Sequence, residues 1–417
     1  MPFSNMVGNR FSNSMALMKP LVILFSGFLF FSLTSENARS QAHPDASLLV
    51  GSVLSPRDAD PIDLHNGMYS RENTDLQVND TIPITLTRVY LTGDSLSRAF
   101  GIGATLSYDM FIVGDSKTFS YAELIMADGA RIHYDRISPG KDFASAIFEH
   151  TTTPSVFYRS RLTWNGNGWT VALRNGSTYK VRACNASSTP GQCGVIEFRN
   201  NQDEVVRIDR DANGNAKRII SPNGKWVALT YDSHNRVIQA DDSLHQSVHY
   251  RYDPAGRLVE VSRAGKKFRY QYDSQNRMIG AEEDNERISN VYVGDLCTKQ
   301  TWWHDGVPHV FRFRFNIDPN GKNRETDVTE PDGSIRRVKF NQNGYTTTDI
   351  YRSGRPDQIT VTFNRDLQTN NLKDVSVSCK QQDKTVRLTT PIGPARSGEL
   401  EADYLISACE TPKRSAN

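Results

Sequence analysis

Three Tyr-Asp pairs recur in the middle of the chain at almost constant spacing. Tyr231-Asp232, Tyr252-Asp253 and Tyr272-Asp273 stand 21 and 20 residues apart. A phenol beside a carboxylate has the groups for acid–base chemistry, but a regular series of such pairs is more typical of a repeated structural role. Each pair precedes a turn that ends in Asn-Arg or Gly-Arg, where the Asp can accept hydrogen bonds from backbone amides. The pattern therefore favours a turn framework over catalysis.

The second candidate for chemistry is the run Trp302-Trp303-His304-Asp305-Gly306. Indole rings beside a His and an Asp are suited to binding a sugar or a protein partner, so we take Trp302, Trp303 and His304 as candidate ligand-binding residues. The alternative is a plain hairpin, because Asp-Gly is a strong turn signal. On a regular strand the two Trp side chains would point to opposite faces and would not line one platform.

The rest of the chain offers little chemistry. Its nine His residues show no metal-ligand spacing, and neither a nucleophile elbow, a phosphate-binding loop nor a zinc-protease motif is present. We therefore expect no catalytic, metal or cofactor site, and a protein that is not an enzyme. A hydrolase of cell-wall sugars that uses Trp302 and Trp303 ranks last, because the sequence places no two carboxylates opposite each other.

The five cysteines leave the disulfide pattern open. Cys184 and Cys193 flank a turn-rich loop and are candidates for one bridge, while Cys379 and Cys409 are candidates for a second one that ties down the tail. Cys297 is then left over as a thiol or as a partner for another chain. None of the spacings matches a zinc site.

The N-terminus has the order of a secretory signal peptide: positive charge at Arg10 and Lys19, an apolar run over 21–34, and a small-x-small cleavage site that ends at Ala42. The alternative is a membrane-spanning helix, but the run is short for a span of about 20 residues. We predict a signal peptide over residues 1–42 and no stable membrane span after its removal. The protein would then reside in an oxidising compartment, where disulfide bonds can form.

Charge and composition limit the kinds of partner that the protein can bind and the fold classes that it can adopt. The full chain has 49 basic and 47 acidic residues, and loss of residues 1–42 leaves 46 of each. A neutral mature chain has no basic excess for nucleic acid, so no nucleic-acid partner is expected. Frequent Gly, Asn, Asp, Ser, Thr and Tyr without long helical stripes favour an all-β protein with many turns.

The Tyr-Asp pairs belong to a longer series of units of 20–25 residues between Cys193 and Asp366. Their predicted anchors, each at the end of a strand, are Ile208, Tyr231, Tyr252, Tyr272, Ile317, Phe340 and Phe363, with a degenerate unit near Val293, which makes about eight units. Alternating apolar residues before each anchor give one buried strand face. Asn or Gly four residues later suits a left-handed turn position, and the following Arg is expected to pair with carboxylates or backbone oxygens on the solvated face.

Short strands also precede the units. A half-buried strand is predicted over Ile82–Tyr90, and Asn-Gly turns separate further strands between 119 and 198. Trp164 and Trp169 flank one of these turns. They are interpreted as a cross-strand aromatic pair, with a sugar-stacking platform as the alternative.

The repeated pattern resembles the Rhs or YD (tyrosine-aspartate) repeats of bacterial Rhs toxins, insecticidal toxin-complex subunits and animal teneurins. The stretches Asp60–Asp63, Thr87–Tyr90 and Phe100–Gly103 are similar to landmarks of the N-terminal domain of Rhs proteins, although Ala104 stands where that domain usually has Trp. The resemblance implies a continuous, spiralling antiparallel β-sheet, which closes into a hollow shell in long members. Full-length Rhs toxins end in a variable enzymatic domain, which is released by self-cleavage at an aspartyl site after the repeats. A cleavage motif of the type Asp-Pro-x-Gly-Leu is not found after Asp366.

The expected organisation is a signal peptide (1–42), an Rhs-type N-terminal domain (43–118), a β-rich connecting region (119–195), a YD-repeat sheet that is open or partly closed (196–366) and a tail (367–417). The expected protein is secreted or periplasmic and bacterial. It acts by structure and by binding a protein or glycan at the cell envelope, without an effector domain of its own. The alternative is the carrier fragment of an Rhs-type toxin system whose toxin is encoded elsewhere.

Overall fold

The computed structural model describes residues 62–388, except for 116, 153–154, 184–193, 284–285 and 381–383, together with Cys409. Every element named in this part of the chain is a β-strand, so the prediction of an all-β protein is confirmed. No helix among the described residues has the length and apolar character needed to cross a membrane. The predicted signal peptide lies outside the described residues, and the other predicted domain boundaries stay predictions.

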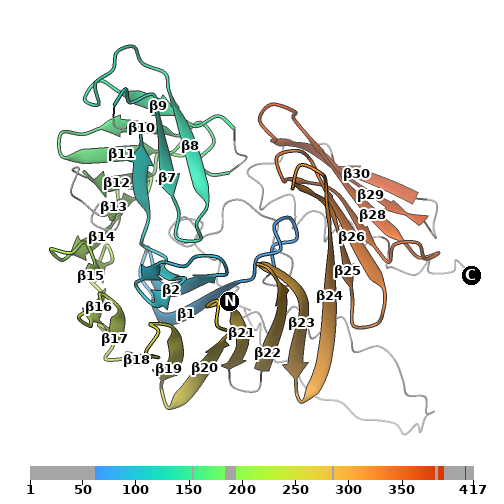
Figure 1. Ribbon diagram of the computed structural model, residues 1–417. Coiled ribbons are helices and arrows are strands. Elements are labelled where there is room, and N and C mark those ends of the chain that lie inside the picture. The colour runs from blue at the N-terminus through green and yellow to red at the C-terminus, as the bar shows by residue number, and fades with distance from the viewer. Residues whose placement is uncertain are drawn as a thin grey trace, which may run out of the picture. The chain divides into compact units, whose positions relative to one another are not determined.

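One antiparallel meander runs from β6 to β30, and each strand pairs with the next along the chain (Figure 1). Its first strands precede the repeats: β6 (Phe111–Gly114), β7 (Tyr121–Ile125), β8 (Arg131–Arg136), β9 (Ile147–Glu149), β10 (Arg161–Trp164), β11 (Gly168–Ala172), β12 (Thr178–Arg182) and β13 (Val195–Arg199). The first and last of these strands meet at their starts. A bridge joins Phe111 to Gly194, and the Val195 N–H donates to the Met110 carbonyl (2.8 Å).

The repeats then continue the meander as paired strands. They are β14 (Val205–Arg210), β15 (Ala216–Ile220), β16 (Trp226–Tyr231), β17 (Val237–Asp242), β18 (Ser247–Tyr252), β19 (Leu258–Arg263), β20 (Lys266–Tyr272), β21 (Met278–Glu283), β22 (Glu286–Val293), β23 (Leu296–His304), β24 (Val307–Ile317), β25 (Asn323–Thr329), β26 (Ile335–Phe340), β27 (Thr346–Tyr351), β28 (Ile359–Arg365), β29 (Leu372–Cys379) and β30 (Lys384–Leu388). No register among the described residues pairs β30 with β6, so the sheet as a whole stays open. The predicted hairpin repeats are therefore confirmed.

The repeat count agrees with about eight units, but two predicted anchors are wrong. The chain turns between Asp211 and Asn215 and between Asp366 and Asn371, so the anchors of the first and last units are Arg210 and Arg365 rather than Ile208 and Phe363. In both units an Arg occupies the position where the pattern calls for an apolar or aromatic residue. The predicted anchors were therefore placed on the apolar residues two positions earlier in the chain. The degenerate unit near Val293 is present, since β22 ends there.

The reason that Arg can replace Tyr at an anchor lies in one hydrogen bond. The Tyr231 hydroxyl donates to the Ala216 carbonyl (2.9 Å), 15 residues earlier in the chain. The Arg210 Nε donates to the Val195 carbonyl at the same distance and the same separation in sequence. A buried carbonyl at this place needs a donor, and either side chain supplies it.

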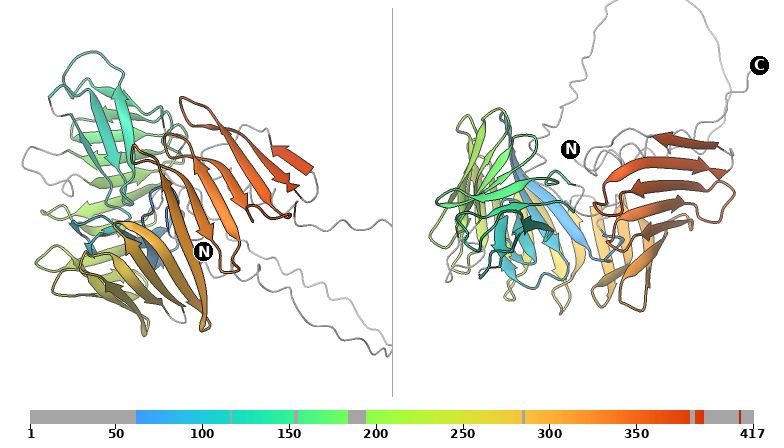
Figure 2. Two further views of the ribbon diagram at one scale, coloured as in Figure 1. Left: turned by 45° about the vertical axis from the view of Figure 1, so that its right-hand side comes forward. Right: turned by 90° about the horizontal axis from the view of Figure 1, so that it is seen from above.

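Residues 62–108, here called the N-terminal segment, lie against the inner face of the repeat sheet (Figures 1 and 2). The segment contains two small sheets: β1 (Ser70–Val78), β2 (Ile84–Leu91) and β5 (Ala104–Leu106) in one, and β3 (Ser97–Arg98) and β4 (Gly101–Ile102) in the other. It shares one continuous apolar core with the meander, which includes Tyr69, Phe100, Phe198 and Tyr250. No pattern in the sequence predicts this packing.

Backbone hydrogen bonds fix the segment at points that are far apart along the sheet. Val237 N–H donates to the Ala99 carbonyl (2.8 Å), Ile102 N–H to the Gly256 carbonyl (3.1 Å), and Cys297 N–H to the Gly67 carbonyl (2.8 Å). The approach is close at Gly101, which has φ of +88°, because a Cβ there would lie 2.5 Å from the Gly256 carbonyl oxygen. Glycine is therefore required for this contact.

Strand β2 is buried more completely than the predicted half-buried strand. Thr87, Arg88, Val89 and Tyr90 are all at most 5 % exposed. One face of β2 packs on the repeat sheet. Near the other face the β7–β8 turn approaches, where the Thr105 hydroxyl donates to the Ala127 carbonyl (2.6 Å). The prediction of a solvated face is wrong, because tertiary packing covers the polar side of the alternating pattern.

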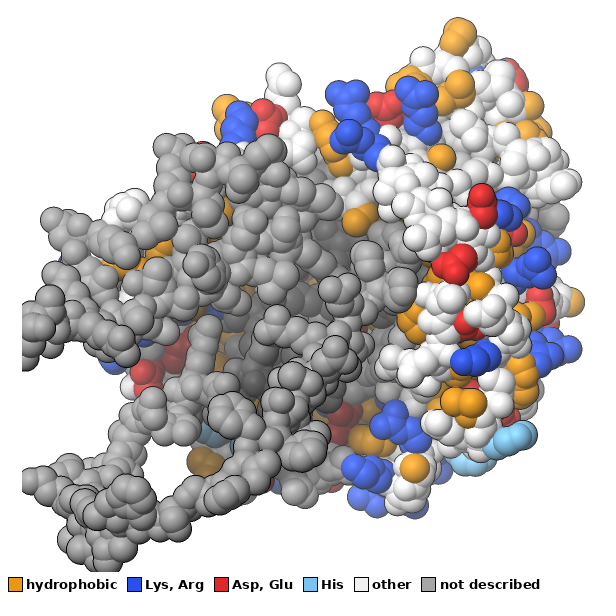
Figure 3. Space-filling model, turned by 180° about the vertical axis from the view of Figure 1, so that it is seen from behind, with side chains coloured by type: hydrophobic (Ala, Val, Ile, Leu, Met, Phe, Trp, Pro, Cys, Tyr) orange, Lys and Arg blue, Asp and Glu red, His pale blue; other side chains and the backbone are white. Residues whose placement is uncertain are grey.

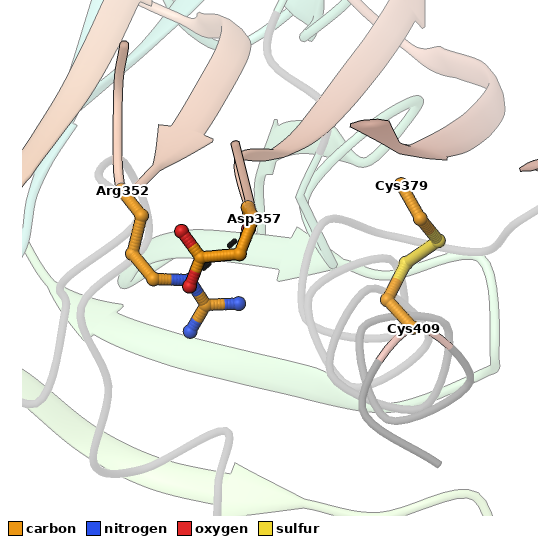
Figure 4. The surroundings of a disulfide bond; sticks show 4 residues. All are labelled: Arg352, Asp357, Cys379 and Cys409. Atoms are coloured by element: carbon orange, nitrogen blue, oxygen red, sulfur yellow. Dashed lines mark hydrogen bonds and ion pairs between the residues drawn. A yellow bond between two sulfur atoms is a disulfide. The ribbon is translucent and has the colours of Figure 1, made fainter. Parts of the chain in front are cut away.

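The last strands form a second apolar cluster, which is made by β28 and β29 and includes Ile359, Phe363 and Val377. A disulfide joins Cys379, at the end of β29, to Cys409, and Cys409 packs against this cluster (Figure 4). Cys184 and Cys193 lie outside the described residues. Cys297 is fully buried, and its Sγ donates to the Lys299 carbonyl (3.5 Å).

Candidate functional site

The Asp of each Tyr-Asp pair organises a turn. Oδ1 of Asp232 accepts hydrogen bonds from the N–H groups of His234 and Arg236 (both 2.9 Å), and its Oδ2 accepts one from the Arg236 Nε (2.8 Å). Asn235 supplies the left-handed residue of this turn, with φ of 59°. The two following pairs repeat the arrangement: Asp253 accepts from Arg257, and Asp273 accepts from Arg277.

Each Arg then reaches the Tyr of the next unit. The guanidinium carbon lies 4.6 Å from the ring centroid of Tyr252 for Arg236, and 5.6 Å from that of Tyr272 for Arg257. The Tyr252 hydroxyl in turn donates to the Val237 carbonyl of the preceding unit (2.6 Å). We call this set of Asp, Arg and the next Tyr the turn latch. It connects consecutive units through side chains that are only partly exposed, rather than on the solvated face expected for the Arg residues.

The electrostatics of the latch oppose acid–base work near neutral pH. Partial burial alone would raise the pKa of Asp232, but hydrogen bonds from Arg236 and its charge hold it below the ordinary value. Burial raises the pKa of Tyr231 well above its ordinary value. The carboxylate therefore stays ionised and the phenol stays protonated, whereas a general acid or base needs a pKa close to the working pH.

A second polar arrangement lies between the N-terminal segment and the sheet. The Arg88 guanidinium binds the Asp75 carboxylate with two contacts (2.6 and 2.9 Å), and the side chains are 6 % and 5 % exposed. The Tyr250 hydroxyl donates to Asp75 (2.8 Å), and Arg88 donates to the Tyr270 hydroxyl (3.1 Å). The charge of Asp75 raises the pKa of Arg88 against the opposing effect of burial.

The arrangement extends to Glu283 of β21. The Arg71 guanidinium lies 2.8 Å from the Glu283 carboxylate, and the Tyr270 hydroxyl donates to the same oxygen (3.3 Å). Asp75, Arg88, Tyr250, Tyr270, Glu283 and Arg71 together are called the buried network. Its charges come from β1, β2 and β21, and no spacing in the sequence indicates it, because the contacting residues are up to 212 positions apart. The one signal was an Arg inside an otherwise apolar strand pattern, which implies a buried partner.

The β23–β24 hairpin holds the predicted ligand-binding residues. Trp302 pairs with His309 and Trp303 pairs with Pro308 across the Asp305-Gly306 turn. The Trp302 ring centroid is 5.4 Å from that of His304 and 5.8 Å from that of His309. Trp303 lies instead beneath the guanidinium of Arg287, at 4.9 Å.

The two indoles therefore lie on opposite faces, as the alternation of a strand predicts. Trp302 shares the inner face with Gln300, which is buried, and with the two His residues. His309 was missed by the sequence analysis. A two-residue turn at Asp305-Gly306 aligns position 309 with position 302, so the hairpin signal alone was sufficient to find it.

Trp164 and Trp169 form the expected cross-strand pair. They oppose each other in the β10–β11 register, with ring centroids 5.4 Å apart and planes inclined by 77°. The Phe143 ring packs on Trp164 at 4.8 Å. An edge-to-face pair of this kind offers no flat platform, so the aromatic-pair interpretation is confirmed.

The comparisons with known proteins fit the geometry of the turn latch. A family model described as RHS Repeat matches residues 231–267 and 252–284, which contain all three Tyr-Asp pairs. The chain contains Rhs repeats. A model for a domain of unknown function, DUF6531, matches residues 59–134 and so covers the N-terminal segment of this Rhs-repeat protein. The assignment of that region as an Rhs-type N-terminal domain stays a prediction.

Two solved structures are also similar to the Rhs-repeat protein. "Crystal Structure of TcdB2-TccC3 without hypervariable C-terminal region" matches at 10% identity and a TM-score of 0.32, over 78% of this chain and 22% of that chain. "Crystal Structure of TcdB2-TccC3-TEV" matches at 10% identity and a TM-score of 0.29, over 77% and 19%. The chain thus spans less than a quarter of either matched chain. No curated protein matches it.

Proposed function

We propose that this Rhs-repeat protein is exported to a secreted or periplasmic location, where it acts by structure and by binding rather than by catalysis. The proposal rests on the observation that the protein's own N-terminal segment packs against the inner face of the sheet. The outer face and the hairpin ends are then the surfaces left for a partner. The predicted signal peptide and the Cys379–Cys409 disulfide agree with an oxidising compartment.

The outer face presents both signs of charge. Glu260 lies within ion-pair distance of Arg251 (3.5 Å), Lys267 (3.3 Å) and Arg269 (3.5 Å), and Lys and Arg are interspersed with Asp and Glu on the face shown in Figure 3. Nucleic acid is held mainly by rows of unpaired cations. Mixed charge favours a protein or glycan partner at the cell envelope.

Trp302, His304 and His309 at the end of the β23–β24 hairpin, here called the Trp302 group, are the best candidate for a glycan contact. The indole is partly exposed, and no described residue accepts a hydrogen bond from its N–H. An aromatic face packs against the C–H groups of a sugar ring, while the indole N–H and the His304 imidazole can bind its hydroxyls. Trp303 is occupied by Arg287 and takes no part in this contact.

The alternative function, a carrier for a toxin encoded elsewhere, receives less support. Such a carrier needs room on the inner face. Between β17 and β25 that face contacts the N-terminal segment, for example where the Thr326 hydroxyl donates to the Leu64 carbonyl (2.6 Å). A cargo would have to displace packed, hydrogen-bonded chain.

The test is a binding experiment with the purified exported protein, using a glycan array and a pull-down from an envelope fraction. We expect the Trp302→Ala variant to bind the captured glycan at least about tenfold more weakly, which corresponds to about 1.4 kcal/mol. The matched control, Trp303→Ala, removes an indole from the opposite face of the same hairpin and should bind like the wild type. Failure to capture any envelope protein or glycan would contradict the proposal.

A further inference from the structure

A hollow of about 280 Å³ lies on the outer face at the β19–β20 hairpin, and we propose that it binds an oxyanion, a sulfate or phosphate group. This site is separate from the Trp302 group, which lies on the inner face of β23 and β24. It does not depend on the function proposed above.

The strand register explains why the hollow exists. His249 of β18 pairs with Ser262 of β19, and Ser262 pairs with Lys267 of β20, so the three side chains form one row across the outer face. Ser262 is short, and it stands between two long side chains. Neighbouring residues in such a row are about 5 Å apart, so a short residue in the middle leaves a gap that water or a small ion can enter.

The lining of the hollow has the chemistry of an anion site. Lys267, Lys266 and Arg263 bring positive charge, His249 adds a ring nitrogen, and Ser262 adds a hydroxyl, whereas none of the lining residues is acidic. The Ser247 side chain also lines the hollow. Its hydroxyl is buried and has no hydrogen-bond partner among the described residues. An unsatisfied buried donor costs free energy, which an acceptor such as a phosphate oxygen would recover.

The existing contacts of Arg263 and Lys267 determine which of these two cations can bind the oxyanion. Arg263 donates through Nη1 to the Thr74 and Asp75 carbonyls, so it fixes the hairpin to the N-terminal segment. Lys267 is 54 % exposed and lies 3.3 Å from the Glu260 carboxylate, which Arg251 and Arg269 also approach. Because Glu260 keeps two other cations, Lys267 can turn to an oxyanion at little cost.

The probes are inorganic sulfate, with chloride adjusted to hold the ionic strength constant, and dextran sulfate, with unmodified dextran as its control. The readout is the set of His Cε1–H resonances of the full chain, in which the His249→Gln variant identifies His249. We expect the His249 resonance to shift and saturate with sulfate. Saturation by inorganic sulfate assigns a free anion, and binding of dextran sulfate alone assigns a polymer-borne group.

Three variants make the test decisive. Lys267→Gln removes the exposed cation, and Ser262→Leu fills the hollow without changing charge; each should weaken binding at least tenfold. Arg269→Gln is the matched control, because it removes a cation from the same Glu260 cluster but does not line the hollow, and it should change binding less than twofold. Equal effects of Lys267→Gln and Arg269→Gln, or a shift that never saturates, would overturn the proposal. Unchanged unfolding midpoints show that the variants fold.

Discussion

The turn latch and the buried network stabilise the same sheet by opposite means. The latch links residues four positions apart and then the next unit, so it is local and partly exposed. The buried network joins β1 and β2 to β18, β20 and β21 and withdraws an ion pair almost completely from water. The latch is repeated from unit to unit, so we expect the loss of one latch to leave the neighbouring units intact. The buried network occurs once, and its loss would remove contacts between the N-terminal segment and three strands of the sheet together.

The largest expected effect is that of breaking the buried ion pair. In Asp75→Ala the Arg88 guanidinium stays buried without its carboxylate, which typically costs about 3–5 kcal/mol. We expect a corresponding fall in the free energy of unfolding, measured by urea denaturation. The control is the double variant Asp75→Leu, Arg88→Met, which removes both charges and should recover most of the loss. An Asp75→Ala protein as stable as the wild type would contradict a structural role for the pair.

Two tyrosines on β18 allow the comparison to be made within one strand. Tyr250 donates to the buried Asp75 carboxylate, and Tyr252 donates to the neutral Val237 carbonyl. A hydrogen bond to a charged group contributes about 1.5–3 kcal/mol and one to a neutral group about 0.5–1.5 kcal/mol. Tyr250→Phe should therefore destabilise the protein more than Tyr252→Phe.

The measurement is again the free energy of unfolding, with both variants compared at the same pH. Both substitutions remove one hydroxyl and keep the ring, so the apolar packing is matched. If the two variants lost equal stability, the distinction between the local latch and the long-range network would have no energetic basis.

The same distinction separates what the sequence predicts from what it does not. The turns at Asp232, Asp253 and Asp273 follow from residue types that lie within five positions, and they were predicted correctly. The anchors Arg210 and Arg365 were missed because the hydrogen bond that they share with Tyr231 is a property of the folded sheet. The buried network could not be predicted, because Arg88 within β2 indicates only that a buried partner is needed and not which strand supplies it.

The Trp302 group falls between these two cases. The alternation of the strand predicted that Trp302 and Trp303 would separate, and the turn at Asp305-Gly306 contained enough information to place His309 beside Trp302. Which of the two faces lies inward depends on packing against the rest of the sheet. The local geometry of a candidate site can thus be predicted from a hairpin, while its exposure depends on the fold.

The smallest expected effect concerns His65, where the N-terminal segment meets the β26–β27 turn. The His65 ring packs edge-on against Phe340 (5.2 Å), and a Cβ on Gly344 would lie 2.7 Å from it. Burial lowers the pKa of His65 below its ordinary value of 6.5, against the charge of Asp63, which raises it, and with Arg324 and Lys322, which lower it further. Protonation is therefore easier in the unfolded chain than in the folded one.

The sign of the pH dependence follows from this shift. The stability contributed by neutral His65 is complete above pH 6.5 and is lost as the pH falls from 6.5 through the lower pKa of the folded state. The carboxylates of the turn latch, whose pKa values are lowered from 3.8, lose their contribution only in more acidic solution, so the two effects occupy separate windows. Between pH 7 and 5 we expect the free energy of unfolding to fall by less than about 1.4 kcal/mol per pH unit because of His65. His65→Gln should flatten this slope while leaving the decline below pH 4 unchanged, and an unaltered slope would show that the contact near Gly344 does not sense pH.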